Sequence, residues 1–152
     1  MEENAPKPIK QETGSEIENE EEKSLRVLVA DDREELREAL TLTLEALGYT
    51  VDAVNDGKEL IEKFNSEKYH CDFIITDFEM PNIDGLEAFR IIREKKELQK
   101  LPILIVTGNP DKLNDEMKKR KLDPPFLGKP FRLEVLKNKI KELIPPKVAS
   151  AE

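Results

Sequence analysis

Five polar side chains stand at or directly after the ends of short apolar runs in this sequence. They are Asp31 and Asp32 after LRVLVA, Asp77 at the end of CDFIITD, Thr107 at the end of LPILIVT, and Lys129 after FLG. Three carboxylates within a few ångströms of one another repel strongly unless a cation offsets their charge. An all-oxygen set that keeps waters and admits a phosphate suits Mg²⁺ better than zinc or a fully enclosed calcium ion. Brought together, these residues would suit phosphoryl chemistry at a magnesium site.

The apolar runs alternate with segments of helical periodicity, so that strand and helix repeat five times. Strands are predicted over residues 25–30, 49–54, 71–77, 101–107 and 125–130, and the first helix is marked by Leu36, Leu40, Leu44 and Leu47. Such alternation predicts an α/β fold with a parallel sheet and helices on both faces. Five strands are too few for a closed eight-stranded barrel. We therefore expect an open doubly wound sheet of the flavodoxin-like type, with strand order 2-1-3-4-5.

The predicted strand order explains why the five polar residues would meet. Ligands of an open parallel sheet bind beyond the carboxyl ends of its strands, and strands one, three, four and five carry these residues there. Most of these residues also have a plain structural explanation. Asp32 could cap the first helix, Thr107 could be an ordinary strand-end hydroxyl, and Lys129 could merely pair with Asp77. Their coincidence at matching strand ends favours a site.

The composition excludes several other classes of function. The 152 residues carry a formal net charge of -8, which argues against non-specific nucleic-acid binding. Cys71 and His70 are the single cysteine and histidine, so we expect no disulfide framework, multi-cysteine zinc site or Ser-His-Asp hydrolase. No apolar run reaches the roughly 20 residues of a membrane helix, and the N-terminus lacks the apolar stretch of a secretory signal. We expect a protein of the reducing cytoplasm.

The chain divides into three parts by composition. Residues 1–24 hold eight glutamates, three lysines and no aromatic residue, so we expect a disordered acidic tail. Its role could be solubility alone or the binding of a partner. Residues 25–144 form the predicted domain, and residues 145–152 form a short C-terminal tail. Because no DNA-binding motif follows Ile144, we expect a stand-alone domain.

Four motifs of the sequence resemble those of a known family. VADD (29–32), ITDFEMPNIDG (75–85), IVTGN (105–109) and FLGKPF (126–131) occur in the order and at the separations found in response-regulator receiver domains of the CheY-like type. Each motif alone is weakly specific, but the set together is highly specific. The resemblance covers about residues 25–144, which is the whole predicted domain.

Carried over position by position, the resemblance implies a phosphorylation site. Asp77 matches the phosphoacceptor, and a carboxylate can form an acyl phosphate by attack on phosphorus. Asp31 and Asp32 match the acidic pair that holds Mg²⁺, together with Asp77 and the backbone carbonyl of Glu79. Lys129 matches the lysine that pairs with the phosphoryl group, so that Mg²⁺ and the ammonium group would neutralise the phosphoryl oxygens.

The resemblance also implies a conformational switch. Thr107 matches the hydroxyl that bonds to the phosphoryl group, and Phe126 matches an aromatic ring that swings inward when Thr107 moves. Asn109 and Pro110 have the residue types of a helix N-cap followed by a first-turn proline, so the fourth helix is predicted to begin there. The resemblance implies that a downstream protein target would bind to the surface of this helix, the fifth strand and the fifth helix. The family further implies a cis peptide bond between Lys129 and Pro130.

The resulting prediction is a stand-alone response regulator of a two-component phosphorelay. A sensor histidine kinase or a histidine phosphotransfer protein would donate the phosphoryl group to Asp77, with Mg²⁺ as the cofactor. The protein would be a phosphoacceptor with self-catalysed transfer and slow self-dephosphorylation rather than an enzyme. We expect no direct contact with nucleic acid or membrane.

Two other functions stay open at this point. A haloacid-dehalogenase-like Mg²⁺-dependent phosphatase would use Asp77 as its nucleophile, although Asp77-Phe78-Glu79 matches the paired-acid signature of that family only loosely. Multiple-turnover hydrolysis of small phosphate esters would favour it. A degenerate receiver acting as a scaffold is disfavoured by the full set of carboxylates, hydroxyl and ammonium.

Members of the family vary at two positions near the site. One lies two residues after the phosphoacceptor and is Glu79 here, and the other lies two residues after Thr107 and is Asn109 here. A carboxylate at Glu79 adds negative charge near the phosphoryl group and the attacking water. Like-charge repulsion therefore predicts slow or metal-sensitive self-dephosphorylation.

Overall fold

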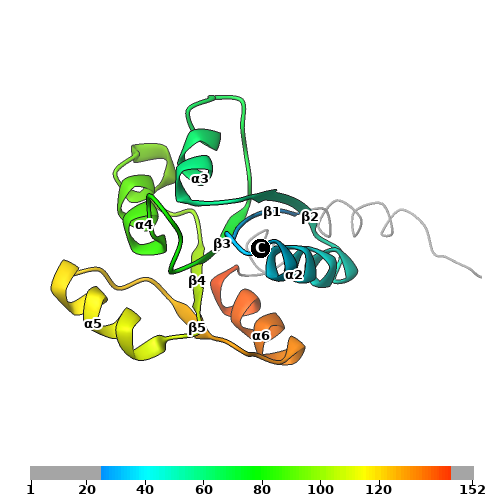
Figure 1. Ribbon diagram of the computed structural model, residues 1–152. Coiled ribbons are helices and arrows are strands. Elements are labelled where there is room, and N and C mark those ends of the chain that lie inside the picture. Colours follow the sequence, from blue (N-terminus) through cyan, green and yellow to red (C-terminus); the bar gives the residue numbers. More distant parts are fainter. Residues whose placement is uncertain (1–24, 145–152) are drawn as a thin grey trace, which may run out of the picture.

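The computed structural model describes residues 25–144, which fold as a five-stranded parallel sheet between helices (Figure 1). The strands are β1 (Arg26–Ala30), β2 (Thr50–Val54), β3 (Phe73–Asp77), β4 (Ile103–Thr107) and β5 (Phe126–Gly128). The helices are α2 (Glu34–Ala46), α3 (Gly57–Lys63), α4 (Gly85–Arg93), α5 (Pro110–Arg120) and α6 (Leu133–Leu143), with a short 3₁₀ turn η2 (Lys96–Leu98). The strand order β2-β1-β3-β4-β5 confirms the predicted fold class and topology.

All five strands are slightly shorter than predicted, and proline residues explain why β4 and β5 begin later. Pro102 and Pro125 precede β4 and β5 and have no N–H to donate to a neighbouring strand, although their carbonyls accept from Ile74 and Ile105. The two predicted tails, 1–24 and 145–152, lie outside the described residues. Within residues 25–144, every helix is too short or too polar to cross a membrane.

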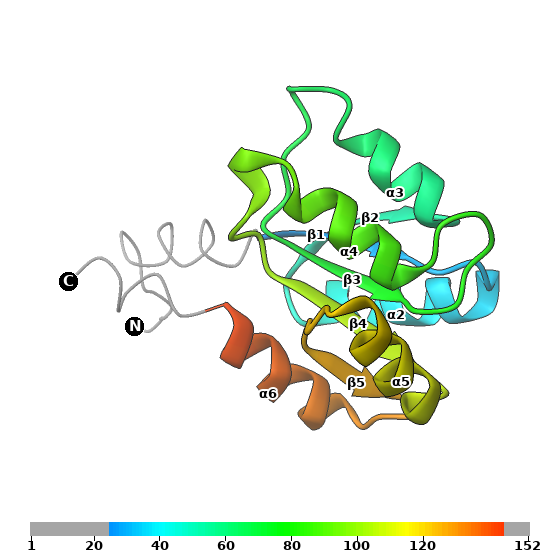
Figure 2. The ribbon, with the colours of Figure 1, turned by 90° about the vertical axis from the view of Figure 1, so that its left-hand side faces the viewer.

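The two faces of the sheet bury two separate sets of side chains, as expected for a parallel sheet covered on both sides. Val27 and Val29 of β1 point toward α2 and α6, whereas Leu28 and Ala30 point toward α3 and α4. A third apolar group joins α5 to the sheet, and Figure 2 shows α5 beside α4 on the same side. This alternation anchors the strands, so the positions of their carboxyl ends are fixed by the core.

Polar residues determine where three of the helices begin. Asp56 accepts the backbone N–H of Glu59 at the start of α3, and Asp84 accepts that of Glu87 at the start of α4. Asn109 caps α5 ahead of Pro110, which is the cap and first-turn proline that the sequence predicts. A glycine follows the carboxyl end of α2. Gly48 takes a φ of 102°, a conformation in which a residue with a side chain would be strained.

Asp32 does not cap α2, contrary to the structural alternative that the sequence left open. The residue before the helix is Arg33, and no side chain caps α2. Oδ1 of Asp31 instead accepts the backbone N–H of Arg33 at 2.9 Å. Asp32 lies one residue too early to cap the helix, so its exposed carboxylate stays available to a ligand.

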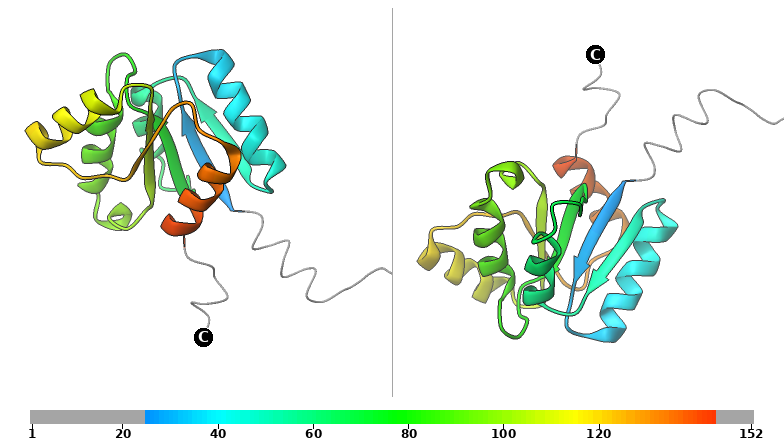
Figure 3. Two further views of the ribbon diagram at one scale, coloured as in Figure 1. Left: turned by 90° about the horizontal axis from the view of Figure 1, so that it is seen from below. Right: turned by 90° about the horizontal axis from the view of Figure 1, so that it is seen from above.

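The register of the sheet brings the chemically interesting strand ends together. Ala30 of β1 pairs with Thr76 of β3, and Asp77 pairs with Val106 of β4. Thr107 pairs with Gly128 of β5, immediately before Lys129. The four strand ends thus form one edge of the sheet. Figure 3 shows that β1 begins and α6 ends at the opposite edge.

Gly85 allows the first turn of α4 to pack closely against this edge. A Cβ atom at position 85 would lie 2.5 Å from the carbonyl oxygen of Asp77 and 3.1 Å from Cα of Phe78. The backbone N–H of Gly85 also donates to the carbonyl of Phe78 at 2.7 Å. The glycine therefore fixes the loop that carries Asp77 and the residues after it.

Candidate functional site

Three carboxylates form a compact acidic cluster at the carboxyl edge of the sheet. Asp31, Asp32 and Asp77 each offer one oxygen, and these oxygens lie within 4.8 Å of one another. Asp31 and Asp77 are only 2% and 7% exposed, whereas Asp32 is exposed. Two fixed carboxylates and one accessible carboxylate make an all-oxygen set that fits a hard divalent cation.

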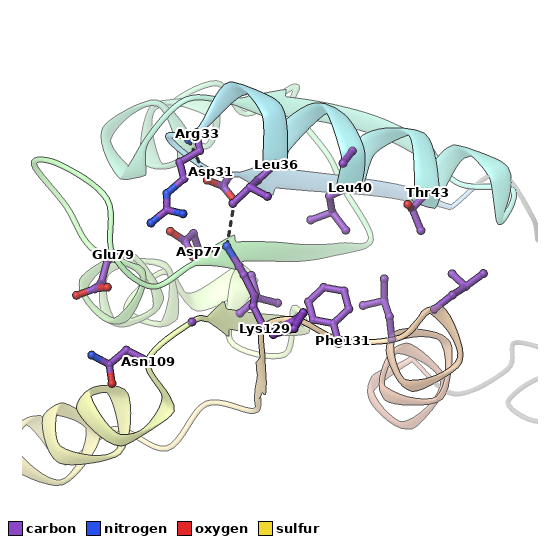
Figure 4. A pocket seen from close by; sticks show the side chains of 16 residues that line it. Asp31, Arg33, Leu36, Leu40, Thr43, Asp77, Glu79, Asn109, Lys129 and Phe131 are labelled. Atoms are coloured by element: carbon purple, nitrogen blue, oxygen red, sulfur yellow. Dashed lines mark hydrogen bonds and ion pairs between the residues drawn. The ribbon is translucent and has the colours of Figure 1, made fainter.

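Lys129 lies opposite the acidic cluster at the end of β5. Its Nζ is 3.0 Å from Oδ1 of Asp77 and 3.4 Å from Oδ2 of Asp31 (Figure 4). Asp31 is held further by the backbone N–H of Arg33 and, through its carbonyl oxygen, by a guanidinium nitrogen of Arg37 at 2.9 Å. Asp31 and Lys129 are thus positioned by neighbouring groups before any ligand binds.

Burial raises the pKa of Asp77 above its ordinary value. The hydrogen bond and charge of Lys129 lower this pKa, but the negative charges of Asp31 and Asp32 raise it again. One ammonium group therefore offsets the cluster incompletely. The remaining negative charge is a physical reason to bind a cation at this edge.

The end of β4 supplies a hydroxyl and open space. Thr107 is buried, and its Oγ1 accepts the backbone N–H of Asn109 at 2.9 Å. A Cβ atom built at Gly108 would meet no protein atom within 4 Å. A ligand of Asp77 can therefore approach the backbone at this position without steric hindrance.

A cavity of about 650 Å³ extends from the polar cluster along the groove between α2 and the start of α6. Asp31, Asp77 and Lys129 line one end, and mostly apolar side chains line the rest, as Figure 4 shows for Leu36 and Phe131. Leu36, one of the leucines whose spacing marks the first helix, is 37% exposed because it borders this cavity. Periodicity alone cannot distinguish a buried helix face from the wall of a groove.

Phe126 lies in β5 and is half buried. Its ring packs against the apolar group that contains Leu113 and Met117 of α5. The structure thus joins the aromatic residue singled out from the sequence to the helix that follows Thr107. The peptide bond between Lys129 and Pro130 is cis, as expected.

Two ion pairs from α5 to the loop after β3 were missed by sequence reasoning. Nζ of Lys112 lies 2.8 Å from Oε2 of Glu79, and both side chains are about half exposed. The guanidinium of Arg120 donates two hydrogen bonds, of 3.0 and 2.9 Å, to the two carboxylate oxygens of Asp84. Arg120 also pairs with Glu116 of its own helix. No local pattern identifies partners that lie more than thirty residues apart in the chain.

A family model and several curated proteins match the sequence of this chain. The family model described as response regulator receiver domain matches residues 27–141. The chain is 36% identical over 124 residues to the response regulator MprA of Mycobacterium ulcerans, which covers 80% of this chain and 50% of MprA. It is 35% identical over 116 residues to the CAI-1 autoinducer sensor kinase/phosphatase CqsS of Vibrio cholerae, which covers 76% of this chain and 17% of CqsS. The chain thus matches half or less of the length of these relatives.

Solved structures share the same fold over most of their length. The chemotaxis response regulator CheY4 of Vibrio cholerae superimposes with a TM-score of 0.70 and 29% identity, covering 80% of this chain and 99% of CheY4. A sensor histidine kinase receiver domain from Pseudomonas aeruginosa, solved with a magnesium ion coordinated in its active site cleft, gives a TM-score of 0.70 and 26% identity over 79% of this chain and 97% of that domain.

The fold, the polar residues at the strand ends and the family model all indicate a receiver domain. Receiver domains are the phosphoacceptors of two-component signalling, receive their phosphoryl group from histidine kinases and bind Mg²⁺ in the active site. The model match spans well over half of the chain. This chain belongs to the response regulator receiver domain family.

Proposed function

We propose that this chain accepts a phosphoryl group on Asp77 from a phosphohistidine of a sensor kinase or a histidine phosphotransfer protein. The observation that carries the proposal is the position of Asp77 at the floor of the polar cluster. Its carboxylate lies 3.0 Å from Nζ of Lys129 and close to Asp31 and Asp32. The nucleophile and the groups that neutralise a phosphoryl group are therefore assembled at one edge of the sheet.

The transfer is a displacement at phosphorus. A carboxylate oxygen of Asp77 attacks the phosphorus atom, the P–N bond to the donor imidazole breaks, and the ring nitrogen leaves with the electron pair. Phosphoryl transfer depends mainly on positioning and on neutralising charge. Lys129 already faces Asp77, so its ammonium group can pair with a phosphoryl oxygen without a large movement.

Asp31, Asp32, Asp77 and the backbone carbonyl of Glu79 are the groups that would hold Mg²⁺. The exposed Asp32 carboxylate is suited to direct contact, and the hydrogen-bonded Asp31 to contact through water. Bound Mg²⁺ supplies positive charge for the phosphoryl oxygens. Asp31 already accepts hydrogen bonds from Arg33, Arg37 and Lys129, which keep its side of the cluster in one geometry for this purpose.

Thr107 and Phe126 would couple phosphorylation of Asp77 to a conformational change at the protein surface. A Thr107 hydroxyl that bonds to the phosphoryl group would leave its present donor, the N–H of Asn109. Phe126 packs against the same helix that Asn109 caps, so α5, β5 and α6 form the surface that would change and bind a downstream protein. The acidic net charge favours a protein target over nucleic acid.

We infer that residues 25–144 are the functional unit and that it acts as a response regulator in the cytoplasm, with slow self-dephosphorylation. Support comes from the apolar core, which closes within these residues, and from the family match over 27–141. The same match favours a receiver over a haloacid-dehalogenase-like phosphatase.

Incubation of the full chain with acetyl phosphate and Mg²⁺, followed by peptide mapping in a mass spectrometer, tests the proposal. We expect one phosphoryl adduct on Asp77, loss of the adduct in Asp77→Asn, and an unchanged adduct in Asp111→Asn, which removes an exposed carboxylate from α5. An adduct on another residue, or no adduct, would reject the assignment. Multiple-turnover release of phosphate from small esters would instead support a phosphatase.

A further inference from the structure

Three hydrogen bonds, connected through the covalent atoms of Asn109 and Lys112, lead from Thr107 to the open side of the acidic cluster. The hydroxyl oxygen of Thr107 accepts from the backbone N–H of Asn109 (2.9 Å), and Oδ1 of Asn109 accepts from the backbone N–H of Lys112 (3.2 Å). Nζ of Lys112 then donates to Oε2 of Glu79 at 2.8 Å. Three consecutive contacts therefore join the end of β4, the first turn of α5 and the loop after β3.

Glu79 stands where its charge affects any ligand of Asp77. It follows Asp77 by two residues and lines the large cavity that contains Asp77. It also lines a second cavity of about 380 Å³, to which Asp32 and Lys112 contribute. A free carboxylate between the two cavities would add a fourth negative charge to a site that must admit an anion. Figure 4 shows Glu79 at the side of the cluster nearest to Asn109.

The position of Lys112 in its helix needs an explanation. It lies in the first turn of α5, where the helix macrodipole favours acidic side chains over cations. Lys112 and Glu79 are 54% and 52% exposed, and ion pairs that are so exposed contribute little to the stability of a fold. Neither helix stability nor fold stability accounts for a lysine here, whereas compensation of the Glu79 charge does.

We propose that Lys112 is a positioning residue for the phosphoryl chemistry of Asp77. It holds the Glu79 carboxylate at the edge of the cavity and offsets its charge, so that an anionic phosphoryl donor can reach Asp77. This inference rests on the proposed function of Asp77. Because Lys112 is joined to Thr107 through the cap residue Asn109, the charge at the cavity edge is linked to the position of the Thr107 hydroxyl.

The linkage gives the pair a different effect before and after phosphorylation. Before phosphorylation, Thr107 holds Asn109, and Lys112 offsets Glu79. A Thr107 hydroxyl that turns to a phosphoryl oxygen would release the backbone N–H of Asn109, the residue whose side chain caps the turn that carries Lys112. In the phosphorylated site, whatever part of the Glu79 charge Lys112 leaves uncompensated opposes hydrolysis by like-charge repulsion.

Variants of the full chain test this coupling. They are Lys112→Ala, the charge-preserving Lys112→Arg, Glu79→Gln, and Lys112→Ala combined with Glu79→Gln. Lys118→Ala is the matched control because it removes an exposed cation from the other end of the same helix. Mg²⁺ affinity is measured by calorimetric titration without any phosphoryl donor. Phosphoryl uptake by Asp77 is measured at saturating Mg²⁺ with dianionic acetyl phosphate and with monoanionic phosphoramidate.

We expect Lys112→Ala to bind Mg²⁺ about two- to tenfold more tightly and to accept phosphoryl from acetyl phosphate about two- to tenfold more slowly. One uncompensated charge several ångströms away has an effect of this size at a protein surface. The loss should be smaller with phosphoramidate, which carries less negative charge. Lys112→Arg and Lys118→Ala should match the native chain, and Lys112→Ala should have no effect when Glu79 is glutamine.

Two results would overturn the inference. One is a Lys112→Ala variant with unchanged Mg²⁺ affinity and unchanged uptake. The other is an effect of Lys112→Ala that is equally large with and without the Glu79 carboxylate. Failure of the native chain to accept phosphoryl on Asp77 would reject the proposed function instead, and the Mg²⁺ titrations would still decide whether Lys112 acts through Glu79.

Discussion

The ammonium nitrogen of Lys129 lies 3.0 Å from Oδ1 of Asp77, although β4 separates the strands that carry the two residues. The same nitrogen is 3.4 Å from Asp31, so one cation serves two buried carboxylates. Buried charges are costly unless they are fully compensated. The edge of the sheet is therefore held in an electrostatically unfavourable state that a cation or a proton relieves.

Binding of Mg²⁺ should stabilise the fold. At a free Mg²⁺ concentration about a hundredfold above Kd, the free energy of unfolding should rise by about 2.7 kcal/mol, because only the folded chain assembles the three carboxylates. Asp32→Asn should remove most of this gain and Glu34→Gln, at another exposed carboxylate, should not. Chemical denaturation at several Mg²⁺ concentrations measures the effect, and curves that do not respond to Mg²⁺ would contradict the assignment of the site.

Protonation of Asp77 should stabilise the Mg²⁺-free protein. Because burial raises the pKa of Asp77 in the folded state, the folded chain binds this proton more tightly than the unfolded chain does. The stabilising contribution is thus complete below the pKa of the unfolded state and is lost as pH rises through the raised folded pKa.

Asp77→Asn should accordingly be more stable than the native chain at neutral pH in the presence of a chelator, and the difference should disappear in acid. Denaturation curves over a pH series measure it, with the exposed Asp111→Asn as the control. A less stable Asp77→Asn at neutral pH would show that the contact with Lys129 outweighs burial.

Substitution by alanine should be costly at one of the two glycines near the site and nearly neutral at the other. Gly85→Ala places a Cβ 2.5 Å from the carbonyl oxygen of Asp77, so it should cost about 1–3 kcal/mol of stability as the loop shifts. Gly108→Ala meets no protein atom within 4 Å and should change stability by less than about 0.5 kcal/mol. Chemical denaturation of both variants is the measurement, and equal losses would contradict the close packing at Gly85.

The pair of Arg120 and Asp84 should hold α5 on the sheet. This helix buries only Leu113 and Met117, so its attachment depends on few contacts. Arg120→Gln should increase amide hydrogen exchange in α5. A double-mutant cycle with Asp84→Asn, which keeps an oxygen to cap α4, should give a coupling energy on the order of 1 kcal/mol. Lys119→Ala is the control because that side chain is well exposed, and a coupling energy near zero would show that the apolar contacts alone position α5.

The strand order and the acidic edge could be predicted because their signals are local. Buried strands read as continuous apolar runs, and the residues that follow them face one edge whenever the strands are parallel. The cap at Asn109 followed from the same kind of local chemistry. The position of the Asp31 carboxylate did not, because it depends on contacts to Arg33 and Lys129 that the folded backbone creates.

Lys112 and Arg120 show why the rest could not be foreseen. Both are ordinary lysine and arginine residues in a helix with several cations, and their partners Glu79 and Asp84 belong to a different segment. Only the distance and rotation of α5 relative to the loop after β3 decide which cations meet which carboxylates. The exposure of Leu36 has the same origin, since the neighbouring groove is formed by α6 from the far end of the sequence.

β1 begins and α6 ends at the edge of the sheet opposite to Asp77 (Figure 3). The chain thus enters and leaves the fold at the edge of the sheet that lies far from the acidic cluster. A fluorophore, an affinity tag or a surface tether joined at either flank would leave the entrance to Asp77 clear. The same geometry would let this fold be grafted between other domains with its reactive aspartate still facing outward.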